Sequence, residues 1–272
     1  MTFPSEPTRH VRSADGTRIA VFELGAGPPL LLVHGATANH TTFRVVGPLL
    51  ASGFRLHALD RRGRGATGDG PRYAIEREFV DVAAVAEAVA AEHGGPVDVF
   101  GHSYGGRVAL GAALRSSALR RVICYEGAPA PSGATYHSTG LEALLGERLA
   151  AGDSAGALEA FMTEVVGMTP ADLARFRADP VWPHRVAAAP TILRELEAET
   201  TPAASLDALG AVSQPVLQIL GGESLPVFHA ATMALDERLR QGRVVVIPGA
   251  AHAAHHTHPD AVRAAVEDFL AD

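Results

Sequence analysis

A serine lies in a short sequence pattern that could make it a nucleophile. The pattern GHSYG occupies residues 101–105, directly after the strand-like run VDVF and directly before the helix-like run GRVALGAALR. A sharp turn between a strand and a helix needs small residues on both sides of a strained serine, whose hydroxyl then stands clear at the start of the helix. The pattern therefore predicts that Ser103 is a catalytic nucleophile. A glycine-rich turn without chemistry is the alternative, and the strand–turn–helix context makes it the weaker one.

A serine hydroxyl attacks only when a base removes its proton, so the chain must also supply a histidine. His252 comes shortly after the strand-like run RVVVI at residues 243–247. From the loop that leaves the last strand, a side chain can reach across the sheet edge to the serine. His255, His256 and His258 follow in the same segment. We predict His252 as the base because it is the first of the four in that loop.

Cleavage of an acyl bond also needs two backbone N–H groups that face the charge developing on the carbonyl oxygen; loss of one such donor typically costs ~10²–10³ in rate. The turn HGAT at residues 34–37, which follows the strand-like run LLLV, can present the N–H of Ala36. The residue after the nucleophile, Tyr104, can supply the second N–H. We predict that these two amides form an oxyanion hole and that Gly35 borders the substrate.

Strand-like and helix-like runs alternate along most of the chain and must position these groups. The strand-like runs are rich in Val, Ile and Leu with little polar alternation, which is typical of parallel strands covered on both faces. Their alternation with amphipathic helices predicts a parallel sheet with right-handed crossovers, and an Asp-Gly turn predicts an antiparallel hairpin within residues 10–24. The predicted strands lie at residues 30–33, 54–59, 97–100, 121–125, 215–220 and 243–247, and helices are expected around residues 79–89, 226–241 and after 259.

One region interrupts this alternation. Residues 132–210 contain no strand-like run, but several helical pieces rich in alanine and leucine and separated by prolines. A helical insertion between two parallel strands is most simply a cap over the carboxyl ends of the strands, where ligands bind in open α/β sheets. We therefore expect a core formed by residues 1–131 and 211–272 and a helical cap, or lid, formed by residues 132–210.

The order of these motifs resembles that of the α/β-hydrolase fold family, and the resemblance covers nearly the whole chain. It rests on the HGAT turn, the turn DRRGRG at residues 60–65, the GHSYG pattern and His252, in that order. The resemblance implies an eight-stranded, mostly parallel sheet flanked by helices, an inserted helical cap, and a Ser–acid–His triad in that chain order. It implies no cofactor. No metal is expected either, because no acidic or cysteine ligand motif accompanies the histidines.

The triad acid is the point where the chain departs from the family pattern. Family members usually carry an aspartate about nine residues after the proline that opens the seventh strand; here that proline is Pro215, and the position is Ser224. Glu223 is adjacent and could serve after a small loop shift. Glu126 ends the run RVICYE, 23 residues after Ser103, and resembles the triad acid of haloalkane dehalogenases and zearalenone-type lactone hydrolases. We predict Glu126 as the acid, with Glu223 as the alternative; a structural ion pair with an arginine is the non-catalytic reading of Glu126.

A shorter likeness concerns the cap. The segment PVW at residues 180–182 resembles a segment in the cap of zearalenone-type lactone hydrolases, where the tryptophan faces the substrate. An indole offers a flat apolar face and one N–H donor, which suits an aromatic or macrocyclic ligand. We expect Trp182 to contact the substrate, and packing within the cap is the alternative.

Composition narrows the range of partners. The chain has 272 residues, of which 47% are hydrophobic and 19% charged, so it can bury a large core and is not disordered. Its net charge of −7 gives no general attraction to nucleic acids or anionic membranes, and the arginines of the DRRGRG turn are expected to fix a loop instead. With one cysteine, Cys124, and neither a secretory leader nor an apolar run of membrane-spanning length, we expect a cytoplasmic monomer or homodimer that acts on a small molecule.

Together these predictions describe a cofactor-independent serine hydrolase that cleaves a carboxylic ester through an acyl-enzyme, with a lactone as a favoured substrate. The same triad can cleave a C–C bond in a diketone or an acyl thioester, and these reactions are the catalytic alternatives. A ligand-binding module on a hydrolase fold is the non-enzymatic alternative, which the missing aspartate at position 224 keeps open.

Overall fold

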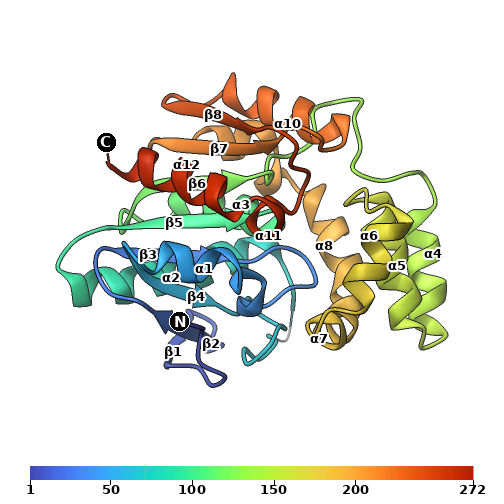
Figure 1. Ribbon diagram of the computed structural model, residues 1–272, viewed down its shortest axis with the longest axis horizontal. Helices are drawn as coiled ribbons and strands as arrows, with labels where there is room; N and C mark the ends of the chain where they lie inside the picture. The colour runs from blue at the N-terminus through green and yellow to red at the C-terminus, as the bar shows by residue number, and fades with distance from the viewer. Residues whose placement is uncertain (71, 272) are drawn as a thin grey trace.

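A mixed sheet of eight strands runs through the described part of the chain. The computed structural model describes residues 1–70 and 72–271. Across the sheet the strands follow the order β1-β2-β4-β3-β5-β6-β7-β8; the pairs β1–β2 and β2–β4 are antiparallel, and all other neighbours are parallel. The strands, shown in Figure 1, are β1 (Arg9–Arg12), β2 (Arg18–Leu24), β3 (Pro29–Val33), β4 (Arg55–Leu59), β5 (Val97–His102), β6 (Leu119–Tyr125), β7 (Val216–Gly221) and β8 (Gly242–Ile247). The predicted strands and the predicted hairpin are confirmed.

Helices cover both faces of this sheet. Because successive strand residues point to opposite faces, Leu31 and Val33 enter one core, whereas Leu30 and Leu32 enter the other. The first core is closed by α2, α3, α9 and α10, and the second by η1, α1, α11 and α12. These elements are η1 (His40–Phe43), α1 (Val46–Leu50), α2 (Ile75–His93), α3 (Tyr104–Ala113), α9 (Leu206–Gly210), α10 (Pro226–Asp236), α11 (Ala254–Thr257) and α12 (Pro259–Ala271).

The longest helix shows how the apolar pattern determines packing. In α2, Phe79, Val82, Val85 and Val89 recur at steps of three and four residues and are all buried. The helix ends at Gly94, whose φ of 76° closes the last turn in the left-handed conformation. Among the described residues, no helix is both long enough and apolar enough to cross a membrane.

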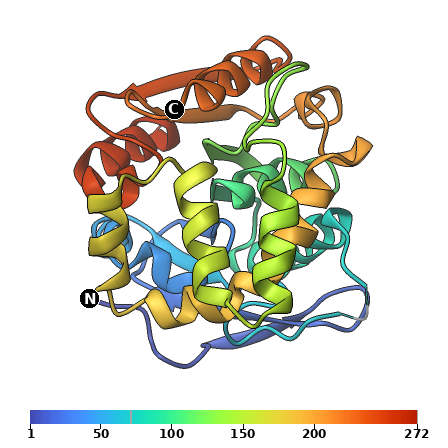
Figure 2. The same ribbon diagram turned by 90° about the vertical axis from the view of Figure 1, so that its right-hand side faces the viewer.

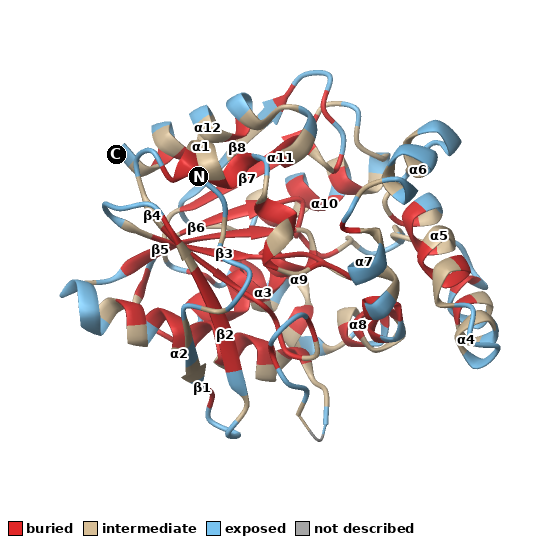
Figure 3. Cartoon of the chain, turned by 60° about the horizontal axis from the view of Figure 1, so that its bottom comes forward, coloured by how far each residue is buried: buried red, intermediate tan, exposed pale blue. Residues whose placement is uncertain are grey.

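Between β6 and β7 the chain forms a helical insert. It has an apolar core of its own, to which Leu158, Phe161 and Ile192 belong. Figure 2 shows the helices of the insert in front of the sheet, and Figure 3 shows that much of their outer surface is exposed. The predicted helical insertion is thus confirmed, while its division from the core at residues 132 and 210 stays a prediction. Its elements are α4 (Leu141–Ala150), α5 (Ser154–Glu164), α6 (Pro170–Arg177), α7 (Trp182–Ala188), η2 (Ala189–Thr191), α8 (Ile192–Glu199) and η3 (Pro202–Ala204).

Candidate active site

Ser103 lies at the turn between β5 and α3, as the sequence pattern predicts. Its backbone adopts φ 55° and ψ −129°, a conformation that costs about 1–3 kcal/mol for a residue other than glycine and persists only where the surroundings hold it. The Ser103 N–H donates to the carbonyl of Tyr125 at 2.7 Å. A Cβ on Gly105 would lie 2.3 Å from the carbonyl oxygen of Val33, so the tight approach of helix and strand requires glycine there.

Glu126 follows β6 and contacts the predicted base. Its Oε2 lies 2.5 Å from Nδ1 of His252, and its Oε1 accepts hydrogen bonds from the Gly221 N–H at 2.7 Å and the Ser224 hydroxyl at 2.6 Å. The side chain of Glu126 is buried, and these donors compensate the loss of water around a carboxylate. Since Nδ1 of His252 faces the carboxylate, Nε2 is the atom left to take a proton.

The two glutamates proposed as the acid have different environments. Ser224, at the position where the resemblance places an aspartate, supplies a hydroxyl donor to Glu126. The neighbouring Glu223 is exposed, and its backbone N–H donates to the carbonyl of Ala250 at 2.8 Å. The structure therefore brings Glu126 together with His252, and within the described chain it shows no such contact for Glu223.

Two backbone amides beside Ser103 have no acceptor. Within residues 1–70 and 72–271, neither Ala36 nor Tyr104 donates its N–H to another protein group. Tyr104 is the first residue of α3, where an N–H has no partner inside the helix. Both residues border the same cavity as Ser103, and an N–H without a protein acceptor is what an oxyanion hole requires.

The predicted catalytic groups surround one small cavity. Ser103, His252, Glu126, Ala36 and Tyr104 all border it. Its volume is about 30 Å³, space for about one or two water molecules. The other residues of its wall are Arg107, Tyr136, Phe161, Val165, Val166, Glu199 and Phe228.

Three further groups of the site were not predicted. Nε2 of His102 donates to the carbonyl oxygen of His252 at 2.9 Å, and Phe228 stacks on the His252 ring with centroids 4.5 Å apart. Arg107 of α3 pairs with Glu199 of the insert at 3.1 Å. An arginine within an otherwise apolar helix is a signal that the sequence does carry, whereas no pattern in the sequence marks Phe228.

Trp182 lies away from this cavity. It begins α7 and packs edge-on against Phe176 of α6, with ring centroids 5.4 Å apart, at the margin of the apolar core of the insert. Among the described residues, those that border the cavity around Ser103 do not include it. Its position agrees with the packing alternative, and contact with a substrate stays a prediction.

Gly35 lies so close to Ser103 that a substitution at Gly35 tests the geometry of the site directly. A Cβ at this position would lie 2.9 Å from Cβ of Ser103 and 3.2 Å from the carbonyl oxygen of His102. Gly35→Ala must therefore displace the nucleophile or the HGAT turn, and we expect kcat for an ester to fall by about 10², the usual cost of a displacement near 1 Å. The control is Gly53→Ala, because a Cβ on Gly53 meets nothing within 4 Å. Equal activity of the two variants would contradict the proposed closeness of Gly35 and Ser103.

Three buried or half-buried histidines adjoin the triad. His255 lies between His102 and His256, with ring centroids 4.2 Å from each. Burial lowers the pKa of His102 and of His255 well below the usual histidine range, and burial with the nearby Arg44 lowers the pKa of His256 to about 3. The folded protein therefore holds these rings neutral.

This cluster predicts that the protein loses stability in mild acid. In the unfolded chain the histidines titrate near pH 6.5, so their contribution is fully present above that pH and is lost as the pH falls below it. At pH 5.5 each costs about 1.4 kcal/mol, so these three alone account for a fall in melting temperature of about 8–16 °C relative to pH 7.5. Burial also lowers the pKa of His34 and of His57, and these two add to the loss in the same direction. Thermal melts at the two pH values measure this. His256→Gln should reduce the difference by about 3–5 °C, the share of one histidine, and a melting temperature that does not change between the two pH values would contradict the prediction.

Comparison with known proteins finds similar sequences and a similar solved structure over most of this chain. Residues 30–265 match the family described as "Alpha/beta hydrolase family". The 2-(acetamidomethylene)succinate hydrolase of Mesorhizobium japonicum is 31% identical over 262 residues, which cover 92% of this chain and 90% of that protein. A pimeloyl-(acyl-carrier protein) methyl ester esterase of Neisseria meningitidis is 30% identical over 253 residues, 88% of this chain and 91% of that protein. The crystal structure of an alpha/beta hydrolase from Sphaerobacter thermophilus superimposes with a TM-score of 0.81 at 31% identity, covering 96% of this chain and 100% of that chain.

Proposed function

Because the chain belongs to the alpha/beta hydrolase family, we propose that it is a serine hydrolase that cleaves carboxylic esters, lactones included, through an acyl-enzyme. The observation that carries this proposal is the contact of Glu126 with His252, at 2.5 Å, on the cavity that Ser103 borders. The free amides of Ala36 and Tyr104 on the same cavity support it.

In the proposed mechanism Ser103 is the nucleophile and His252 acts in turn as base and acid. Nε2 of His252 removes the proton of Ser103 as Oγ bonds to the carbonyl carbon, and the carbonyl electron pair moves to the oxygen, which the amides of Ala36 and Tyr104 stabilise. The tetrahedral intermediate expels the alkoxide, which takes the proton from His252. A water molecule, deprotonated by His252, then attacks the acyl carbon. The second tetrahedral intermediate breaks its bond to Oγ of Ser103, which takes the proton back from His252, and the acid is released. Glu126 holds the tautomer of His252 and stabilises its cation.

The wall of the cavity indicates the kind of ester. Phe161, Val165, Val166 and Phe228 make much of it apolar, and the ion pair of Arg107 with Glu199 adds one polar region. We infer a substrate with an apolar body and one polar group. The two relatives act, by their names, on 2-(acetamidomethylene)succinate and on a methyl ester. Family membership therefore does not determine which group departs from the acyl carbon. Lactones are included because the acid follows β6, as in the zearalenone-type enzymes that the chain resembles.

A panel of matched substrates tests this proposal. We expect a p-nitrophenyl ester and a lactone to be hydrolysed with kcat/KM at least about tenfold above an acyl thioester and a diketone of the same acyl group. Among the described residues of the cavity wall, Arg107 is the one arginine or lysine, and it is paired with Glu199, so the wall offers little attraction to an anionic thioester carrier. Ser103→Ala gives the background rate. Faster turnover of the thioester or the diketone would contradict the ester proposal and favour thioester hydrolysis or C–C bond hydrolysis instead.

A further inference from the structure

The carbonyl oxygen of Gly35 accepts hydrogen bonds from two side chains behind the oxyanion hole, besides a longer one of 3.4 Å from the backbone N–H of Ala38. Nδ1 of His34 lies 2.9 Å from it, and Nη1 of Arg61 donates to it at 3.1 Å. The backbone N–H of Arg61 donates to Nε2 of His34 at 3.0 Å, so Nε2 is the acceptor and Nδ1 carries the proton of a neutral ring. Burial lowers the pKa of His34 well below its usual value, which keeps that ring neutral.

These bonds act on the peptide that supplies the first oxyanion donor. The Gly35 C=O and the Ala36 N–H belong to one peptide plane, and among the described residues every peptide bond is trans. In a trans peptide the two groups point in opposite directions. Fixing the carbonyl of Gly35 from behind therefore fixes the direction of the Ala36 N–H, and donors on the carbonyl also polarise the peptide and strengthen its N–H as a donor.

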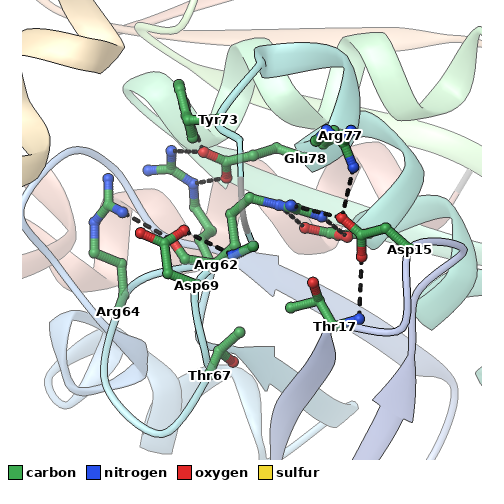
Figure 4. Close-up of polar contacts among 12 residues, drawn as sticks. Asp15, Thr17, Arg62, Arg64, Thr67, Asp69, Tyr73, Arg77 and Glu78 are labelled. Atoms are coloured by element: carbon green, nitrogen blue, oxygen red, sulfur yellow. Dashed lines mark hydrogen bonds and ion pairs between the residues drawn. The ribbon is translucent and has the colours of Figure 1, made fainter.

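Arg61 is itself held by five hydrogen bonds. Its Nε and Nη2 donate to Glu78 at 2.6 and 2.7 Å, Nη2 also donates to Glu195 of α8, and Nη1 donates to the carbonyl oxygens of Gly35 and His34. Arg61, Glu78 and Glu195 are all at least 98% buried. Figure 4 shows Glu78 beside Tyr73, whose hydroxyl donates to it at 2.8 Å. Glu195 belongs to the insert, so Arg61 joins the insert to the Gly35–Ala36 peptide, while Arg185 of α7 donates to the next carbonyl oxygen, that of Ala36, at 3.2 Å.

The same guanidinium adjoins the second donor residue. The Arg61 Cζ lies 4.5 Å from the centroid of the Tyr104 ring, and the hydroxyls of Tyr73 and Tyr104 lie 2.7 Å apart. Arg61 therefore contacts both proposed donor sites, the Gly35–Ala36 peptide and Tyr104, and Tyr73 contacts Tyr104 as well.

We propose that Arg61 is a positioning residue of the oxyanion hole, which aims the Ala36 amide at the reacting carbonyl oxygen and connects that amide to the insert through Glu195. The inference rests on the proposed function, because an oxyanion hole matters only to an acyl-transfer reaction. Arg61 does not touch the substrate; it acts through the Gly35–Ala36 peptide.

The chain offers a closely matched control in the next residue. Arg62 is as buried as Arg61, and two of its nitrogens also donate to one carboxylate, that of Asp81, each at 2.7 Å. Its third nitrogen donates to Asp15 at 3.0 Å, as Figure 4 shows, and within the described chain Arg62 makes no hydrogen bond to the HGAT turn. Arg61→Lys and Arg62→Lys each keep a cation and remove the fork of the guanidinium.

Steady-state kinetics of these two variants test the inference. We expect Arg61→Lys to lower kcat for an ester by about 10–100-fold, up to the ~10² that loss of one oxyanion donor costs, with KM within about threefold of wild type. The Ki of a trifluoromethyl ketone, whose adduct with Ser103 carries the oxyanion, should rise by the same factor as kcat falls. Arg62→Lys should keep kcat and Ki within about threefold, although both variants lower the melting temperature.

The outcomes separate this inference from the proposed function. Equal losses of kcat in both lysine variants, or an unchanged Ki in Arg61→Lys, would overturn the role of Arg61 while the hydrolase proposal stands. A wild-type protein that cleaves no ester, or one whose ester hydrolysis is unchanged in Ser103→Ala, would overturn the proposed function instead. If Arg61→Lys does not fold, Glu195→Gln decides: it loosens Arg61 without removing it and should lower kcat about three- to tenfold, and an unchanged kcat would overturn the inference.

Discussion

Replacing Ser103 with alanine is expected to lower kcat for an ester by a factor on the order of 10⁵–10⁶, because loss of a triad nucleophile removes the covalent pathway altogether. The oxyanion donors at Ala36 and Tyr104 remain, so a rate somewhat above that of uncatalysed hydrolysis should persist. Initial rates with a p-nitrophenyl ester measure the loss. The melting temperature should change little, because Ser103 is only half-buried.

Ser116, a buried serine away from the cavity, provides the control for this variant. The Ser116 hydroxyl donates to Glu87 at 2.8 Å, and Ser116 does not border the cavity. Ser116→Ala should therefore keep its activity within about twofold while losing about 1 kcal/mol of stability. A Ser103→Ala variant that retains more than a tenth of the wild-type rate would contradict the nucleophile assignment.

Glu126→Gln is expected to lower kcat by about 10⁴, whereas Glu223→Gln should leave it within about twofold. The amide of a glutamine can face Nδ1 of His252 as a donor, which favours the tautomer that carries its proton on Nε2 and blocks proton removal from Ser103. Glu223 is exposed, so its charge is screened by water. The kcat of both variants under the same conditions measures the difference, and the melting temperature reports whether each variant is folded.

The reverse ranking of these two variants would make Glu223 the acid. Equal and small losses in both would place the acid at another residue. Ser224→Ala adds a graded check: it removes one hydrogen bond of 2.6 Å from Glu126, and we expect a loss of about three- to tenfold in kcat, the equivalent of the net contribution of one ordinary hydrogen bond, because the Gly221 N–H still donates to the same carboxylate.

The sequence predicts the fold well because the signals of this fold are local. Strand-like runs without polar alternation become the buried parallel strands, and the step of three and four residues from Phe79 to Val89 becomes the buried stripe of α2. The turn around Ser103 is equally local, since glycines within two residues of it permit its geometry.

The candidate site is only partly predictable, because some of its contacts join residues that are far apart in the chain. Spacing from Pro215 falls on Ser224 and leaves two glutamates as candidates, and only the folded arrangement puts Glu126 against His252. The contact of Arg61 with Glu195 spans 134 residues. No periodicity encodes it, because it depends on how the insert packs on the core.

The central claim is that Ser103 is an activated nucleophile, and the most direct test is to label the folded protein with a fluorophosphonate and to locate the modified residue by mass spectrometry. We expect rapid labelling at Ser103 that is lost in His252→Ala, because the hydroxyl attacks phosphorus only when a base takes its proton. Absence of labelling in a sample with an intact thermal transition would contradict the account, and the ligand-binding module would then replace the enzyme as the better description.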